Sequence, residues 1–333
     1  MFGRIVKGVG NFFDVFVESA SENDRGGEFK NQIVRCNSKG IFRFERDSIK
    51  PLVGDAVDIS INKYNKDSTL GIIEKIHERK NFLSRPSVAN LDILFIVASV
   101  KSPDPAYFFI DKLAACAVYN YIEPVIIANK TDLLDGGKDS EKDCEVELYD
   151  IYKKAGFKAV KLSALTDADS PGFDEIRNEL SGKICAFAGI SGAGKSSILN
   201  KLFGLNLKTG ALSEKLERGR HTTRTVELFR HDIGGTGGYV ADTPGFSMLD
   251  FDYVDIRDRG IKESTREILK EELIMLFPDL QEYAYSCKYR GCTHLKEEGC
   301  AVASAVTKGL AVKSRHESYA ELYEQLKGLK GKK

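Results

Sequence analysis

Hydrophobic positions in the first 80 residues occur in short runs that alternate with polar positions, and no segment there has a convincing helical period. Such alternation is typical of half-buried β-strands. Polar or Gly/Asp-rich links separate the runs, which lie at 4–9, 12–18, 28–36, 54–61 and 70–78. This many short strands in so short a segment favours a small closed barrel or a sandwich.

From residue 91 the pattern changes to strands that alternate with helices. The apolar run at 92–100 is continuous, as in strands buried on both faces of a parallel sheet. Further strands are expected at 123–130, 158–164 and 183–189, with helices at 104–120, 140–155, 172–180 and 194–204. Segments 225–231 and 238–245 can pair as a hairpin. We therefore predict an α/β doubly wound sheet with one antiparallel edge.

Beyond residue 252 the pattern becomes helical, is interrupted by a Cys/His cluster, and ends in an expected helix at 314–327 with a basic tail. The whole chain thus predicts three domains. These are an all-β barrel at 1–80, an α/β domain at 81–251 and a helical domain at 252–333.

Composition limits the partners and the compartment. Lys plus Arg and Asp plus Glu both total 49, so a basic surface for nucleic acid has to be local. No apolar run reaches the ~18 residues of a membrane span, and the start of the chain has no signal-peptide core. Four of the seven cysteines are scattered, which suits a reducing compartment. We expect a cytoplasmic protein without a membrane partner.

A phosphate-binding loop is predicted at 189–196, where "GISGAGKS" fits G-x-x-x-x-G-K-[ST] between an expected strand and an expected helix. Backbone N–H groups of such a loop converge on phosphate oxygens at a helix N-terminus. Lys195 would reach the β- and γ-phosphates, and the Ser196 hydroxyl would bind Mg²⁺. The alternative is a chance glycine-rich turn. The expected nucleotide-binding residues here are Gly189, Ile190, Ser191, Gly192, Ala193, Gly194, Lys195, Ser196 and Ser197.

Two later segments resemble nucleotide switches. In "DTPG" (242–245), Asp242 would hold Mg²⁺ through a water and the Gly245 N–H would sense the γ-phosphate, although this is also an ordinary turn sequence. In "GRHTTR" (219–224), Thr223, or failing that Thr222, would complete Mg²⁺ coordination when the γ-phosphate is present. The alternative for this hexapeptide is a solvated basic loop.

A guanine-reading loop is predicted by "NKTD", which supplies Asn129, Lys130, Thr131 and Asp132. Guanine presents N1–H and a 2-amino group side by side, and the Asp132 carboxylate can accept from both. Asn129 would brace the loop, Lys130 would lie along the ring, and Ser163–Ala164 could offer a backbone N–H to guanine O6. A plain turn remains the alternative for the tetrapeptide, and an ATP-dependent enzyme is opposed by Asp132.

The base-reading loop precedes the phosphate loop, the reverse of the usual order. Both loops can still meet, because ligands bind at the carboxyl ends of the strands in an open α/β sheet whatever the chain order. We therefore interpret the α/β domain as circularly permuted. With "RKNFLSRPSVANLD" (79–92), the permuted motifs resemble the bacterial ribosome small-subunit-dependent GTPase A family. The resemblance implies an OB-type barrel, a zinc domain, and a GTPase that binds the immature small ribosomal subunit and is stimulated by it.

The Cys/His cluster offers three thiols and one imidazole within fourteen residues, a complete set for a closed, structural Zn²⁺ site. Its spacing is only moderately specific but matches the cluster of the resembled family. A redox pair or plain packing is the alternative. The expected ligands are Cys287, Cys292, His294 and Cys300.

Hydrolysis needs an oriented water, and the position after "DTPG" that holds Gln in many GTPases is Phe246 here. We expect slow turnover by the isolated protein and name His221 as the catalytic candidate, which the family resemblance supports. Alternatively, His221 contacts RNA or solvent. The leading hypothesis is a monomeric GTPase that releases the small subunit and its rRNA on hydrolysis. Its rival is a nucleotide-gated rRNA-binding module in which hydrolysis is incidental.

Overall fold

The structure is a computed structural model, which describes residues 1–20, 28–38, 50–61, 70–84, 86–134, 148–165, 170–204, 226–241 and 272–328. These residues form two compact units. One unit contains the N-terminal barrel, the linker that follows it, the starts of two sheet strands and a β-hairpin. The other contains the remaining described strands, the helices and the C-terminal region.

The first 76 residues supply the closed barrel predicted from the sequence, with strand order β1-β2-β3-β5-β4. Val34 and Cys36 on one strand, and Val57 and Ile59 on another, are buried, while the residues between them are more exposed. This alternation puts one face of each strand into the barrel core. The strands are β1 (Phe2–Val9), β2 (Phe12–Ser19), β3 (Ile33–Ser38), β4 (Ala56–Ile61) and β5 (Leu70–Ile76).

The strand expected at 28–36 was wrong at its beginning, because β3 starts at Ile33. Asn31 has a left-handed backbone with φ of +61°, which breaks the extended chain there. The Gln32 side chain donates to the Glu28 carbonyl oxygen at 2.8 Å and closes a local turn. Polar side chains that bond nearby backbone compete with strand pairing in this way.

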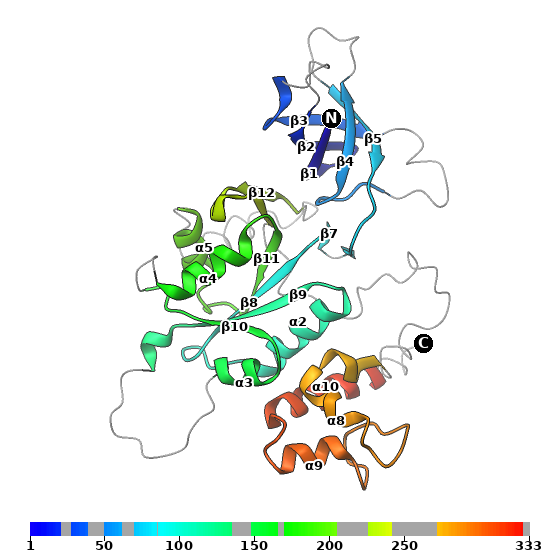
Figure 1. Cartoon of the computed structure of the whole chain (residues 1–333), viewed down its shortest axis with the longest axis vertical. Coiled ribbons are helices and arrows are strands. Elements are labelled where there is room, and N and C mark those ends of the chain that lie inside the picture. The colour runs from blue at the N-terminus through cyan, green and yellow to red at the C-terminus, as the bar shows by residue number, and fades with distance from the viewer. Residues whose placement is uncertain are drawn as a thin grey trace. The chain divides into compact units, whose positions relative to one another are not determined.

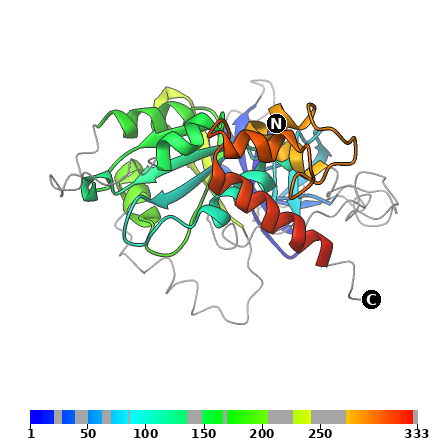
Figure 2. The ribbon, with the colours of Figure 1, turned by 90° about the horizontal axis from the view of Figure 1, so that it is seen from below.

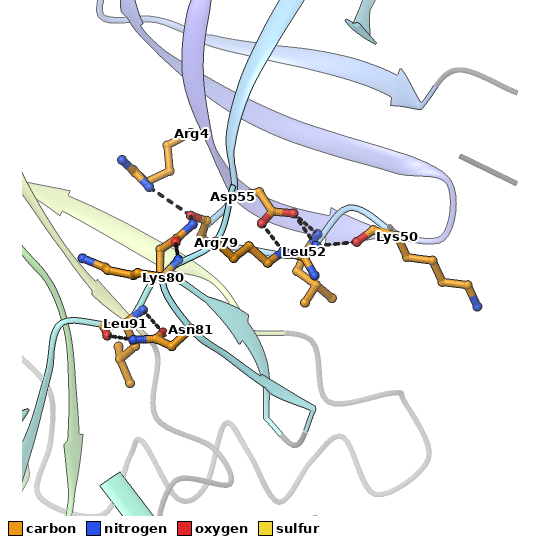
Figure 3. Close-up of polar contacts among 10 residues, drawn as sticks. Arg4, Lys50, Leu52, Asp55, Arg79, Lys80, Asn81 and Leu91 are labelled. Atoms are coloured by element: carbon orange, nitrogen blue, oxygen red, sulfur yellow. Dashed lines mark hydrogen bonds and ion pairs between the residues drawn. The ribbon is translucent and has the colours of Figure 1, made fainter. Parts of the chain in front are cut away.

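A buried ion pair closes the end of the barrel beside the linker (Figure 3). The Asp55 side chain has no exposed surface, and its two oxygens lie 2.6 and 2.8 Å from Arg79 Nε and Nη2. The Leu52 N–H also donates to the Asp55 carboxylate at 2.7 Å. A bidentate, charge-assisted pair of this kind is strong and directional.

Polar side chains in the linker of residues 79–92 form further hydrogen bonds with the backbone (Figure 3). The Asn81 side chain exchanges two hydrogen bonds with the Leu91 backbone, at 2.7 and 2.9 Å. Asp92 exchanges two more with the Ile184 backbone, at 2.7 and 2.8 Å. A small hairpin that the sequence analysis missed, β6 (Phe82–Ser84) with β7 (Ser87–Ala89), lies between them. The polar residues of this segment therefore have structural partners.

Asp55→Asn should lower the free energy of unfolding by about 2 kcal/mol, because hydrogen bonds to a charged group contribute about 1.5–3 kcal/mol and Arg79 would keep only neutral acceptors. Urea unfolding followed by circular dichroism measures this change. Asp58→Asn is the matched control: Asp58 is 42% exposed and pairs with His77 on the barrel surface, so its effect should stay below about 0.5 kcal/mol. Equal effects of the two variants would contradict the assignment.

The α/β part of the chain is a six-stranded sheet in the order β10-β9-β8-β11-β13-β12. β9 and β10 are parallel, as are β11 and β13, whereas β12 is antiparallel to β13 at the edge. This arrangement confirms the predicted doubly wound sheet with one antiparallel edge. The strands are β8 (Ile93–Ser99), β9 (Glu123–Asn129), β10 (Lys158–Lys161), β11 (Ile184–Ala188), β12 (Leu228–His231) and β13 (Gly238–Ala241).

Helices cover both faces of the central strands, with α2 and α3 on one side and α4 and α5 on the other (Figure 1). β8 and β11 are buried along their whole length, and the rings of Phe95 and Phe187 stack with centroids 4.7 Å apart. The helices are α2 (Tyr107–Tyr119), α3 (Leu148–Lys154), α4 (Pro171–Leu180) and α5 (Lys195–Phe203). The helix expected at 140–155 corresponds to α3, and residues 140–147 lie outside the described ones.

The described C-terminal residues are helical, as predicted, and the Cys/His cluster lies between two of the helices. α8, α9 and α10 gather into one group (Figures 1 and 2). The elements are a 3-10 turn (Leu273–Leu276), α8 (Pro278–Ala284), α9 (Ala301–Thr307) and α10 (Lys313–Gly328).

Candidate functional site

Asn129 at the end of β9 joins three loops that are distant in the sequence. Its Nδ2 donates to the Ala193 carbonyl oxygen at 2.8 Å, and its Oδ1 accepts from the Ala164 N–H at 3.0 Å. The side chain is fully buried. The "NKTD" loop, the Ser163–Ala164 loop and the "GISGAGKS" loop therefore meet at one edge of the sheet, although their order in the chain is inverted.

Asp132 lies beside the second of these loops. The Ser163 hydroxyl donates to Asp132 Oδ1, and the Leu165 N–H donates to the Ser163 hydroxyl oxygen at 3.2 Å. Lys130, just before, has a left-handed backbone with φ of +65°, a conformation that is uncommon for residues with a side chain and often marks functional sites. Asp132 is thus oriented by its neighbours, with its carboxylate partly accessible.

Two glycines of the phosphate loop are required by close packing. A Cβ atom at Gly189 would lie 2.2 Å from the Val97 carbonyl oxygen, and one at Gly194 would lie 2.1 Å from Asn129 Nδ2. Both residues also have positive φ, of +147° and +98°. Any larger residue would therefore push the loop away from β8 or from Asn129.

Lys195 is the first residue of α5, directly after the phosphate loop. Its ammonium group donates to the carbonyl oxygens of Gly189 and Ile190, the latter at 3.1 Å. Burial lowers the pKa of Lys195. The cation is therefore held over the loop by carbonyl oxygens, a position from which it can turn to phosphate oxygens.

One contributor to this site was missed by the sequence analysis: residues 100–106, between β8 and α2. The Lys130 ammonium donates to the Ser102 carbonyl oxygen, and the Val100 N–H donates to the Asn129 carbonyl oxygen at 3.0 Å. A Cβ at Gly192 would lie 3.6 Å from Pro103 Cδ, so this loop also touches the phosphate loop. Backbone carbonyl partners leave no sequence motif, which explains the omission.

The four predicted metal ligands come together. Their donor atoms all lie within 4.8 Å of one another, with Cys287 Sγ 3.4 Å from His294 Nδ1 and 4.0 Å from Cys300 Sγ. Zn–S bonds of about 2.3 Å in a tetrahedral site put two sulfurs about 3.8 Å apart. The donor set and its spacing therefore fit a zinc ion.

The loop that carries the cluster is tied by a carboxylate and by α10. Glu297 accepts hydrogen bonds from the N–H groups of Thr293 and Leu295 at 2.8 and 3.1 Å. Although burial raises the pKa of Glu297, the bonds from Thr293 and the neighbouring backbone hold it at about 2. His316 Nε2 lies 2.7 Å from the His294 carbonyl oxygen and so acts as the donor.

Family comparison identifies the chain. A model described as RsgA GTPase matches residues 76–252, more than half of the chain, and one described as RsgA N-terminal domain matches residues 2–73. The chain belongs to the RsgA GTPase family. It is therefore a GTPase, as the sequence predicted.

RsgA relatives match almost the whole chain. A protein named "Small ribosomal subunit biogenesis GTPase RsgA" from Caldanaerobacter subterraneus subsp. tengcongensis is 40% identical over 98% of this chain and 95% of its own. Its namesake from Agathobacter rectalis is 36% identical, covering 98% of both chains.

Solved RsgA-like structures share the fold. The structure of YloQ, described as a circularly permuted GTPase, has a TM-score of 0.70 at 32% identity and covers 100% of this chain and 96% of its own. YjeQ from Thermotoga maritima has a TM-score of 0.69 at 30% identity, with 98% coverage of both chains. The inverted order of the base and phosphate loops in this chain is thus a circular permutation, as predicted.

Several sites expected in this RsgA-family chain lie outside the described residues. They are His221, Thr222, Thr223, Asp242, Gly245 and Phe246. Within the described ranges, no helix combines the length and the apolar character needed to span a membrane.

Proposed function

We propose that this GTPase acts in late maturation of the small ribosomal subunit, hydrolysing GTP to GDP and phosphate with Mg²⁺ and responding to the subunit by faster turnover. The observation that carries the proposal is the meeting of the three loops at Asn129, because the loops predicted to bind guanine and phosphate then lie at one edge of the sheet. The names of the relatives connect this architecture with small-subunit biogenesis.

The base would be held by the first two loops and the phosphates by the third. Asp132 accepts from guanine N1–H and the 2-amino group, while the backbone of Ser163 and Ala164 faces O6. Thr131 and the stem of Lys130 complete the base site. The N–H groups of residues 189–197 surround the phosphates, helped by the N-terminus of α5 and by Lys195.

Hydrolysis would use the segments beyond β13 and before β12. Ser196 would bind Mg²⁺ directly, Asp242 would hold it through a water, and Thr223 would join them when the γ-phosphate is present, while the Gly245 N–H would sense that phosphate. The bound ion would supply positive charge close to the transferring phosphoryl group. His221 is our candidate for orienting the attacking water.

We assign one structural Zn²⁺ to Cys287, Cys292, His294 and Cys300. Three thiolates and an imidazole leave no open coordination position, so the ion stabilises the C-terminal fold and takes no part in the reaction. We further propose three domains, at residues 1–80, 81–251 and 252–333. We expect the protein to be a monomer in the cytoplasm.

The partner would be the immature small subunit and its rRNA. The barrel, as an OB-type domain, and the C-terminal domain flank the GTPase domain in the chain, and OB-folds are common nucleic-acid-binding modules. We expect subunit affinity to fall steeply as salt rises, because released counterions drive phosphate contacts. Equilibrium binding over a salt series tests this, and an affinity independent of salt would contradict an RNA partner.

The decisive experiment measures GTP hydrolysis with and without purified small subunits. The proposal expects slow turnover alone and a clear increase with small subunits, but none with large subunits. A variant that binds GTP but cannot hydrolyse it should remain trapped on small subunits. If that variant still supports maturation and is released normally, the protein is a nucleotide-gated RNA binder.

His221→Ala should lower subunit-stimulated turnover by about 10²-fold, the usual scale for losing a group that assists proton transfer or orients water. GTP affinity should stay within about twofold of the original, since the proposed role of His221 is to orient the attacking water and not to bind the base. His231→Ala, at the end of β12, is the matched histidine control. Full stimulated turnover by His221→Ala would remove His221 from the mechanism.

A further inference from the structure

A buried ion cluster joins α10 to the GTPase helices. The Arg315 side chain is 1% exposed, and its Nη1 lies 2.6 Å from Asp111 Oδ1 on α2, whose side chain has no exposed surface. Its Nη2 lies 2.9 Å from Asp279 Oδ1 on α8, which is 6% exposed. One guanidinium thus holds α2, α8 and α10 at a single point.

Two aromatic rings pack against the Arg315 guanidinium. Its central carbon lies 4.7 Å from the ring centroid of Phe277 and 4.9 Å from that of Phe157. The Tyr152 hydroxyl of α3 donates to the same Asp111 oxygen at 2.8 Å. Although burial disfavours the cation, Asp111 and Asp279 raise the pKa of Arg315, so it stays charged. Replacing a buried ion cluster by apolar residues is often neutral or stabilising, so the role that we infer for this one is to fix a single arrangement of the three helices.

The same helix holds the Cys/His loop through the next side chains. His316 donates to the His294 carbonyl oxygen at 2.7 Å, and the Tyr319 hydroxyl donates to the Thr293 carbonyl oxygen at 3.0 Å. Tyr319 is 1% exposed. α10 therefore contacts the metal-ligand loop and α2 with residues that are adjacent or one turn apart.

The helix α2, which Arg315 contacts through Asp111, also adjoins the predicted nucleotide loops. α2 begins at Tyr107, and the loop before it contacts two residues of the "NKTD" loop. The Lys130 ammonium donates to the Ser102 carbonyl oxygen, and the Val100 N–H donates to the Asn129 carbonyl oxygen. A displacement of α2 would therefore act on the base-reading residues. A rigid helix of thirteen residues carries such a displacement along its axis.

We propose that Arg315 is a positioning residue that couples the Cys/His cluster to the nucleotide site through Asp111 and α2. Guanine nucleotide would raise the affinity for Zn²⁺, and Zn²⁺ would raise the nucleotide affinity by the same factor, because thermodynamic coupling between two sites is reciprocal. The coupling rests on the nucleotide and zinc sites proposed above, but it uses none of the segments that flank the hairpin β12–β13.

Two matched variants isolate the link. Asp111→Leu and Asp279→Leu each remove one carboxylate and leave Arg315 paired with the other. Only Asp111→Leu cuts the charged contact to α2, and Asp111→Asn is a milder version that keeps a hydrogen-bond acceptor. Lys313→Met, at an 81% exposed side chain of α10, is the surface control.

The test measures the zinc affinity of the full chain by equilibrium competition with a chelator, with and without GDP. In the original protein, GDP should raise the zinc affinity by about fivefold or more, the lower end of usual couplings. That ratio should fall to near one in Asp111→Leu and persist in Asp279→Leu and Lys313→Met. If Asp111→Leu retains the ratio, or if the original protein has none, the proposal is overturned.

A second readout separates this proposal from the zinc assignment. If metal analysis finds no zinc, the zinc assignment fails, and amide hydrogen exchange of α8 and α10 still tests the path. GDP should protect these helices in the original protein and in Asp279→Leu. If Asp111→Leu does not fold, Asp111→Asn should show a reduced protection. Equal protection in all variants would mean that Arg315 has a purely structural role.

Discussion

Asp132→Asn is expected to lower GTP affinity by about 10³-fold or more and to create affinity for xanthosine triphosphate. Guanine presents two adjacent donors, N1–H and the 2-amino group, and an ionised carboxylate accepts from both. The amide of an asparagine at position 132 can accept from N1–H through its oxygen, but its NH₂ group would face the 2-amino group of guanine, so that two donors oppose each other. Xanthine has an oxygen at that position, so donor and acceptor match again. Sites built on such hydrogen bonds discriminate by about 10⁴ or more.

Competition against a fluorescent guanine nucleotide measures these affinities with GTP, xanthosine triphosphate and ATP. Ser163 should still donate to the oxygen of residue 132, so the loop keeps its shape and only the pattern facing the base changes. Asp150→Asn, exposed on α3, is the control and should bind GTP unchanged. If ATP competes as well as GTP in the original protein, Asp132 does not read the base.

The features that the sequence predicted are those fixed by local rules. Continuous apolar runs predicted the strands β8, β9 and β11, because both faces of such a strand are buried and its residues need not alternate between apolar and polar. The motif loops follow these strands, and the carboxyl ends of parallel strands share one edge. The meeting of Asn129 with Ala193 follows from that geometry, in spite of a sequence separation of 64 positions.

The features that the sequence did not predict depend on single long-range contacts. Arg315 and Asp111 are 204 positions apart, and a charged residue on a helix is ordinarily read as exposed. The linker amides Asn81 and Asn90 lie in a segment that resembles the family, but only the structure shows their backbone partners. The left-handed turn at Asn31 likewise overrides the local strand pattern. None of these contacts produces a periodic signal.

Cys292→Ala is expected to abolish stable zinc binding and to unfold the Cys/His loop together with α9, whose N-cap is Cys300. The original protein should contain about one zinc ion per chain, and structural sites of this kind provide about 10–16 kcal/mol of apparent binding energy at neutral pH. Within the described residues, the cluster loop has few alternative anchors beyond Glu297 and the contacts from α10. Loss of one ligand therefore removes much of what orders the region. Metal analysis and the helical signal in circular dichroism measure both effects.

Cys36→Ala is the matched control, because Cys36 is a fully buried thiol in the barrel, remote in sequence from the cluster. It should keep the zinc content and the helical signal of the C-terminal region, while costing some barrel stability. Chelation of the original protein should reproduce the effect of Cys292→Ala. Added Zn²⁺ should restore the zinc content and the helical signal of the chelated protein, but not those of the variant. Full metal content and unchanged helicity in Cys292→Ala would show that the four side chains only pack together, since a closed tetrahedral site cannot lose a thiolate without loss of affinity.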